Sequence, residues 1–128
     1  MSRNCVLVVD DDDLVRETMV ELINDYGCQA TGAANGLEAI ETLLMSESDI
    51  CLVFLDLAMP VMDGAAFREE QLKRSEIKHI PVVLMSAFGN LQNQSKQMRV
   101  EAYLQKPLSE AQIMDVVKRY CECAQGSA

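Results

Sequence analysis

Short apolar runs alternate with amphipathic segments along the whole chain, and this alternation limits the folds that it can adopt. Three runs are continuously apolar, as is typical of strands that are covered on both faces. They are residues 5–9, 50–55 and 81–85. Two more mixed runs, residues 29–33 and 102–105, suit the edges of a sheet. Because helical segments separate the five runs, the pattern predicts βαβ units in one parallel sheet.

The helical segments carry their own start and stop signals. Apolar side chains at helical spacing precede Gly27, which stands where a left-handed C-terminal residue is common. Capping residues predict the starts of three further helices, namely Asn35, Asp63 and Ser109. Residues 89–99 differ, because they are rich in Asn, Gln and Ser and have little apolar periodicity. We expect the fourth helix, in this segment, to be short, displaced or mobile.

The number of strands and the length of the chain together indicate the fold. A chain of 128 residues has room for one domain, here residues 1–128 with a core over about residues 5–122. Five strands separated by helices favour a flavodoxin-like doubly wound (βα)5 fold. In that fold the five-stranded parallel sheet has the order 2-1-3-4-5 and its crossovers are right-handed.

The charge of the chain excludes some partners. It has 20 Asp and Glu residues against 11 Lys and Arg residues, which gives a net charge of −9. Such a charge opposes contacts with a phosphate backbone, so we expect no direct binding of nucleic acid. No apolar run approaches the roughly 18 residues of a membrane span. We therefore expect no membrane partner and a cytoplasmic location.

The five cysteines are interpreted as unpaired thiols. Cys5, Cys28 and Cys51 lie in apolar stretches and are read as small core residues. Cys121 and Cys123 form a C-x-C pair, which we interpret as partly exposed thiols at a helix end. A zinc site is disfavoured, because zinc needs about four ligands and the chain has one histidine.

Polar and charged residues stand where the predicted strands end. Four aspartates, Asp10 to Asp13, follow the first strand, and Asp56 closes the third. The crevice of a doubly wound sheet lies at the carboxyl ends of these two strands, so the acids should converge and require a cation. Oxygen ligands favour Mg²⁺. Ser86 and Lys106 at the next two strand ends complete a set of groups suited to handling a phosphoryl group.

Four segments resemble the signature of bacterial response-regulator receiver domains. They are residues 8–11, 56–64, 85–87 and 103–107, and the similarity spans residues 5 to about 120. The resemblance implies a switch in a two-component phosphorelay rather than an enzyme that turns over a separate substrate. It also implies that Asp56 accepts a phosphoryl group from a histidine kinase or phosphotransfer protein.

The resemblance further implies a metal site. Asp10 and Asp11 would hold Mg²⁺ together with Asp56 and the backbone carbonyl of Ala58. The acidic run leaves a second frame open, in which Asp11 and Asp12 form the pair. We prefer the first frame because the apolar strand ends directly before Asp10.

The remaining implied roles belong to the switch. Lys106 would pair with the carboxylate and then with the phosphoryl oxygens, and its peptide bond to Pro107 is cis in the family. Ser86 would move toward the phosphoryl group, and Tyr103 would turn inward behind it. Phe88 stands where family members tune loss of the phosphoryl group. Ser86 and Lys106 are 20 positions apart, which is shorter than usual in the family, so the signalling face is altered.

The residues of the site disfavour three alternative functions. A receiver-like protein-interaction module that is not phosphorylated is disfavoured by the presence of Asp56 and Lys106. An aspartate-nucleophile phosphatase would need a D-x-D-x-T motif, but Leu57 and Ala58 follow Asp56. An FMN binder would need a phosphate loop in place of the four acids. The output, the cognate kinase and the oligomeric state stay open, including a homodimer formed on phosphorylation. Whether the chain stands alone or belongs to a longer regulator or hybrid kinase is also left open.

Overall fold

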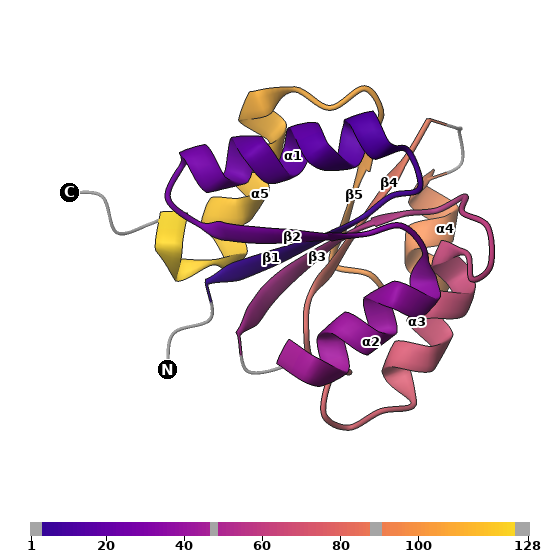
Figure 1. The fold of residues 1–128 in the computed structure, drawn as a ribbon. Helices are drawn as coiled ribbons and strands as arrows, with labels where there is room; N and C mark the ends of the chain where they lie inside the picture. The colour runs from indigo at the N-terminus through magenta and orange to yellow at the C-terminus, as the bar shows by residue number, and fades with distance from the viewer. Residues whose placement is uncertain (1–3, 47–48, 88–90, 125–128) are drawn as a thin grey trace.

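A five-stranded parallel sheet lies between two layers of helices in the computed structural model, which describes residues 4–46, 49–87 and 91–124 (Figure 1). The strand order is β2-β1-β3-β4-β5, so the predicted topology is confirmed. The strands are β1 (Cys5–Val9), β2 (Gln29–Ala33), β3 (Ile50–Asp56), β4 (Val82–Ser86) and β5 (Ala102–Gln105). The helices are α1 (Asp13–Asp25), α2 (Gly36–Ser46), α3 (Gly64–Leu72), α4 (Leu91–Met98) and α5 (Glu110–Tyr120), followed by the short 3₁₀ turn η1 (Glu122–Ala124).

Alternate residues of the central strands supply two separate cores. Val6 and Val8 of β1 pack with α1 and α5 on one face of the sheet, while Leu7 and Val9 pack with the other helices. Figure 1 shows the same division, with α1 and α5 on one side and α2, α3 and α4 on the other. Strands buried on both faces explain why the sequence of β1, β3 and β4 is continuously apolar.

Side-chain caps define the helix ends that the sequence predicts. Asp63 accepts a hydrogen bond from Ala66 N at the start of α3. Ser109 and Gln112 exchange both bonds of a capping box at the start of α5. Gly27, after α1, has φ +95°, a conformation that favours glycine. None of the helices in the described residues has both the length and the apolar character needed to cross a membrane.

Helix α4 is held at its C-terminal end by an arginine of α3. The described helix has eight residues, of which Leu91 and Ser95 are buried, and residues 89 and 90 of the segment expected to be short, displaced or mobile lie outside the described residues. The buried guanidinium of Arg68 donates to the carbonyl oxygens of Met98, at 2.9 Å, and of Arg99. Arg99 has a positive φ of 57°. One side chain therefore binds the last turn of α4 to α3.

The prediction of unpaired cysteines is wrong for four of the five. Disulfides join Cys28 to Cys123 and Cys51 to Cys121, while Cys5 is free. The paired residues are 95 and 70 positions apart, so no local spacing reveals the partners. The fold brings them together, because the end of α5 lies beside the starts of β2 and β3.

Candidate functional site

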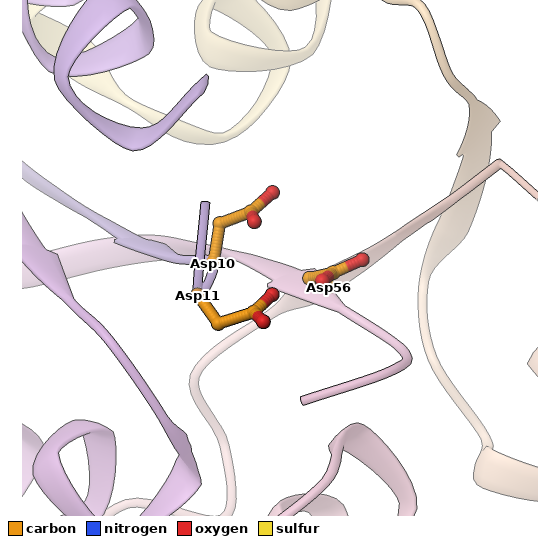
Figure 2. A group of neighbouring side chains, drawn as sticks. All are labelled: Asp10, Asp11 and Asp56. Carbon is orange, nitrogen blue, oxygen red and sulfur yellow. The ribbon is translucent and has the colours of Figure 1, made fainter. Parts of the chain in front are cut away.

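Three aspartates converge at the carboxyl ends of two neighbouring strands. Asp10 and Asp11 follow β1, and Asp56 is the last residue of β3, which pairs with β1. Each offers a carboxylate oxygen that lies within 4.8 Å of the others, and Figure 2 shows the three side chains projecting in the same direction. Asp10 is fully buried, Asp56 is 6% exposed, and Asp11 is exposed. The cluster therefore concentrates negative charge at one rim of the sheet.

Asp10 accepts three hydrogen bonds that fix its position. Its Oδ1 accepts a bond from Asp12 N at 2.9 Å, and its Oδ2 accepts one from Lys106 Nζ at 2.7 Å. Its backbone carbonyl accepts a bond from Arg16 Nη1 at 2.8 Å. A Cβ at position 32 would lie only 2.8 Å from Arg16 Cδ, so Gly32 leaves the space through which this arginine passes.

Asp56 has a perturbed acidity. Burial and repulsion from Asp10 raise the pKa of its carboxyl to about 6, although the nearby Lys106 ammonium acts in the opposite direction. Lys106 Nζ lies 3.3 Å from Asp56 Oδ1. One ammonium thus faces two buried carboxylates, and its single positive charge does not balance their two negative charges.

Lys106 is positioned by the end of β5 and by the bond that follows it. Its backbone N–H donates to Ser86 O at 2.8 Å, and its peptide bond to Pro107 is cis, as the resemblance implies. Burial works to lower the pKa of the Lys106 ammonium, but hydrogen bonds and attraction from Asp10 and Asp56 outweigh burial and raise it. The side chain is therefore charged at neutral pH.

The donor set of the cluster fits a hard divalent cation. Its ligand atoms are all carboxylate oxygens, which Mg²⁺ prefers. Burial and, after it, repulsion from Asp10 raise the pKa of Asp56, and a cation would offset that repulsion. Ala58 lies exposed in the loop after β3. A Cβ at Gly64 would lie 2.8 Å from Asp56 O, so glycine is required where this loop turns back.

The structure separates Asp12 from the cluster. Asp12 is the N-cap of α1, and its carboxylate accepts bonds from Leu14 N and Val15 N. Asp10 and Asp11 are the two members of the run that group with Asp56. The geometry therefore matches the frame that we preferred from the sequence.

The two predicted switch residues lie in different surroundings. Ser86 is 2% exposed at the end of β4, beside β3. Tyr103 is 42% exposed on the edge strand β5, opposite Leu84, so the structure does not bring it to the cluster. Phe88 lies outside the described residues.

Arg16 stands at the spacing that the resemblance implies when Asp10 and Asp11 are the acidic pair, but its contact with the backbone of Asp10 was not predicted. The two residues are six positions apart, a spacing that lies across a strand–helix turn and has no standard periodicity. One signal was present, because a glycine inside a strand, such as Gly32, often marks a close approach by another group.

A family model, curated relatives and solved structures all match most of the chain. A family model described as the response regulator receiver domain matches residues 6–118. Sporulation initiation phosphotransferase F of Bacillus subtilis is 36% identical over 124 residues, which cover 94% of this chain and 95% of that protein. The polar-differentiation response regulator DivK of Brucella anthropi is 28% identical over 117 residues, covering 90% and 94%. The chemotaxis protein CheY4 of Vibrio cholerae shares the fold, with a TM-score of 0.84, 23% identity and coverage of 93% and 99%.

Proposed function

The chain belongs to the response regulator receiver family, and we propose that Asp56 is the phosphoacceptor through which it works as a switch in two-component signalling. One observation carries this assignment. Asp56 is the buried carboxylate at the carboxyl end of β3 that faces both the acidic pair after β1 and the ammonium of Lys106. No other described carboxylate has this combination of neighbours.

The proposed reaction is a phosphoryl transfer from a phosphohistidine. A carboxylate oxygen of Asp56 forms a bond to phosphorus while the bond from phosphorus to the donor imidazole nitrogen breaks. The products are an aspartyl phosphate and an unphosphorylated histidine. The attacking carboxylate must be ionised, and the pKa of about 6 leaves most of it ionised at neutral pH. We further propose that the same rim hydrolyses the aspartyl phosphate and so resets the switch.

Asp10, Asp11 and Asp56, with the backbone carbonyl of Ala58, are the residues that we propose to hold Mg²⁺. When bound, the ion would neutralise charge on the phosphoryl oxygens as they approach the carboxylates. Asp10 is already oriented by its bond from Asp12 N, so this ligand needs little rearrangement.

Lys106 and Ser86 are the groups that we propose to respond to the phosphoryl group. Lys106 now divides its charge between Asp10 and Asp56, and a phosphoryl group on Asp56 would offer it a third anionic partner. Ser86 supplies a hydroxyl from the adjacent strand end. Tyr103 is the outer member of the switch in this proposal, and its exposed position is the one from which it would turn inward.

A docking surface for the phosphodonor lies next to Lys106. A groove of about 230 Å³ runs between α1 and the loop before α5, and it is lined by Leu14, Thr18, Met19, Lys106, Pro107 and Leu108. Leu14 is 74% exposed at the edge of this groove. An apolar patch beside the phosphoacceptor suits a histidine kinase or phosphotransfer protein.

We also propose that the chain acts in the cytoplasm and binds neither a membrane nor nucleic acid. We further propose that it forms a homodimer when Asp56 is phosphorylated.

Intact-mass measurement after incubation with acetyl phosphate and Mg²⁺ tests the assignment. The wild-type chain should gain one phosphoryl group, and both Asp56→Asn and the addition of EDTA should abolish the gain. Asp12→Asn is the matched control, because it removes one charge from the same acidic run and asparagine keeps the helix cap. Equal phosphorylation of wild type and Asp56→Asn would disprove the assignment.

A further inference from the structure

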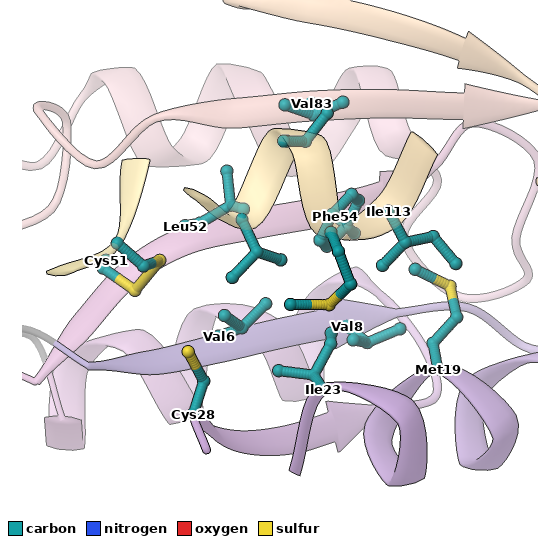
Figure 3. Close-up of a cluster of buried hydrophobic side chains, with 14 of the residues drawn as sticks. Val6, Val8, Met19, Ile23, Cys28, Cys51, Leu52, Phe54, Val83 and Ile113 are labelled. Atoms are coloured by element: carbon teal, nitrogen blue, oxygen red, sulfur yellow. A yellow bond between two sulfur atoms is a disulfide. The ribbon is translucent and has the colours of Figure 1, made fainter. Parts of the chain in front are cut away.

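Four cysteines gather at the end of the sheet opposite to the aspartates. Cys28 precedes β2, Cys51 is the second residue of β3, and both lie at the amino ends of their strands. Cys121 and Cys123 follow α5 and supply the partners, with Cα–Cα distances of 5.5 and 5.2 Å to Cys51 and Cys28. Figure 3 shows Cys28 and Cys51 at one end of the core cluster, away from Met19 and Ile113.

The two disulfides differ in their access to solvent. Cys51 and Cys121 are 4% and 0% exposed, so both sulfur-bearing residues of this inner bond are buried. In the outer bond, Cys28 is 3% exposed but Cys123 is partly exposed in η1. Thiol–disulfide exchange requires direct attack on a sulfur atom, and Cys123 is the one member of the two bonds that is not buried.

We propose that these four cysteines form a reversible redox site, in which the Cys28–Cys123 bond opens before the Cys51–Cys121 bond. The site goes beyond the phosphoacceptor function and does not depend on it. Its co-reactant is a cellular dithiol for opening and a disulfide of the same class for closing. Disulfides in cytoplasmic proteins are commonly transient and redox-sensing, which fits the cytoplasmic location that we propose.

The exchange balances as a two-electron step at each bond. A thiolate of the dithiol attacks Sγ of Cys123, the Cys28–Cys123 bond breaks, and Cys28 leaves as a thiolate that takes up a proton. The second thiolate of the reagent then displaces Cys123, which also takes up a proton. The chain is reduced by two electrons, and the reagent is oxidised to its disulfide. The inner bond follows by the same chemistry.

The order follows from the path of the chain, because the outer bond tethers the turn η1, whose Cys123 packs against the cluster that contains the inner bond. Cys121 ends α5, where its N–H donates to Val117 O at 2.8 Å, and η1 with Cys123 follows at once. When Cys28–Cys123 opens, η1 loses its covalent attachment to the start of β2. Cys121 is then no longer protected by a tethered turn, so the inner bond becomes accessible.

The site controls how firmly α5 is attached to the sheet. In the oxidised chain, the end of α5 and the turn η1 are bonded to β3 and β2. In the reduced chain, noncovalent contacts hold the helix, chiefly the apolar contacts of Ile113, Val116 and Val117, with a hydrogen bond from Tyr26 Oη to Glu110 Oε1. Since α5 begins four residues after Lys106, one helix connects the redox site to the opposite rim.

Timed reduction with dithiothreitol, followed by alkylation and peptide mass mapping, tests the proposal on the full chain. Alkylated Cys28 and Cys123 should appear first and alkylated Cys51 and Cys121 later, and oxidised dithiothreitol or oxidised glutathione should restore both bonds. The fully reduced chain should melt about 10 °C below the oxidised chain. In Cys123→Ser the inner bond should open without the delay seen in wild type. Cys5→Ser is the matched control and should keep both steps, because Cys5 is the free cysteine.

Three results would overturn the proposal. They are simultaneous opening of both bonds, failure of the reduced chain to re-form the same pairs, and a thiolate charge-transfer band on adding Co²⁺ to the reduced chain. The last result would assign the cysteines to a metal site. Phosphorylation by acetyl phosphate, measured on oxidised and reduced samples, distinguishes failure of the redox site from failure of the phosphoacceptor assignment. If the redox site is wrong, Asp56 should still be phosphorylated. If the assignment of Asp56 is wrong, the cysteines should still open and close in order.

Discussion

Lys106 Nζ lies 2.7 Å from Asp10 Oδ2, although the two residues are 96 positions apart in the sequence. The contact closes the sheet rim, because it joins the end of β1 to the end of β5 across β3 and β4. It also means that the lysine is bound more closely to the acidic pair than to the proposed phosphoacceptor, Asp56, at 3.3 Å. Any group that draws Lys106 toward Asp56 must therefore compete with Asp10.

Asp56→Asn should stabilise the metal-free chain at neutral and higher pH. The pKa of Asp56 is about 6 in the folded chain and about 4 in an unfolded chain, so ionisation disfavours the folded state. A raised carboxyl pKa gives stability that is present below pH 4 and is lost as the pH rises through 6. The substitution should raise the free energy of unfolding by about 2 kcal/mol at pH 8 and have little effect below pH 4. Urea denaturation in EDTA at both pH values measures this difference.

Lys106→Ala should retain Mg²⁺ binding but lose the conformational response. Removing the ammonium leaves Asp10 buried without its charged partner, which should cost about 3 kcal/mol of stability in EDTA. The cluster becomes more negative, so its affinity for Mg²⁺ should not fall. Beryllofluoride should then produce few of the NMR shift changes seen in wild type. Lys73→Ala, on an exposed ion pair, is the control, and full wild-type shifts in Lys106→Ala would contradict the role given to the ammonium.

Helix α4 should exchange its amide hydrogens faster than α1 or α5. Of its two buried residues only Leu91 is apolar, whereas α1 buries two apolar residues and α5 buries four, so less apolar burial opposes its opening. Hydrogen exchange should show lower protection for residues 91–98 than for residues 13–25 and 110–120, and beryllofluoride should increase that protection. Equal protection in all three helices of the free chain would show that contacts other than apolar burial hold α4.

Arg68→Lys tests whether one side chain anchors α4. An ammonium presents a single nitrogen, so it cannot reproduce the separate bonds of the guanidinium to Met98 O, Arg99 O and Gln71 Oε1. We expect a loss of about 2–3 kcal/mol in unfolding free energy and faster exchange in residues 91–98. Arg119→Lys, at an exposed pair with Asp115, should change neither quantity measurably.

The chain should not bind duplex DNA at physiological salt. Its charge of −9 repels the phosphate backbone, and phosphorylation adds further negative charge. Fluorescence anisotropy with micromolar protein should give no signal before or after treatment with acetyl phosphate. A complex that weakens as salt is added would show a local basic surface that net charge conceals.

The sheet could be predicted because its signals are local. Continuous apolar runs identified the central strands, mixed runs identified the edge strands, and the order followed from five βα units. Asp10, Asp11, Asp56 and Lys106 could be placed at one rim for the same reason, since each ends a strand or lies within two residues of a strand end. In a parallel sheet the carboxyl ends of all strands lie at the same edge, so residues at those ends lie close together in space.

Other features depend on packing between distant segments and escaped prediction. The disulfides join residues 70 and 95 positions apart, and the spacing of the cysteines contains no information about which of them meet. The bonds from Arg68 to the end of α4 depend on how two helices dock, and no local pattern in the sequence marks this arginine as buried. Tyr103 stays exposed because β5 is an edge strand.

Cys51 and Asp56 lie on the same strand, five residues apart, which in extended backbone is about 16 Å. Substitutions separated by more than about 10 Å and without shared partners usually have additive effects. A double-mutant cycle between the two ends of β3 should therefore return a coupling energy close to zero for stability. A coupling energy different from zero would require an element that changes position and contacts both ends of β3. Helix α5 is that element, because it is attached at both ends of the sheet.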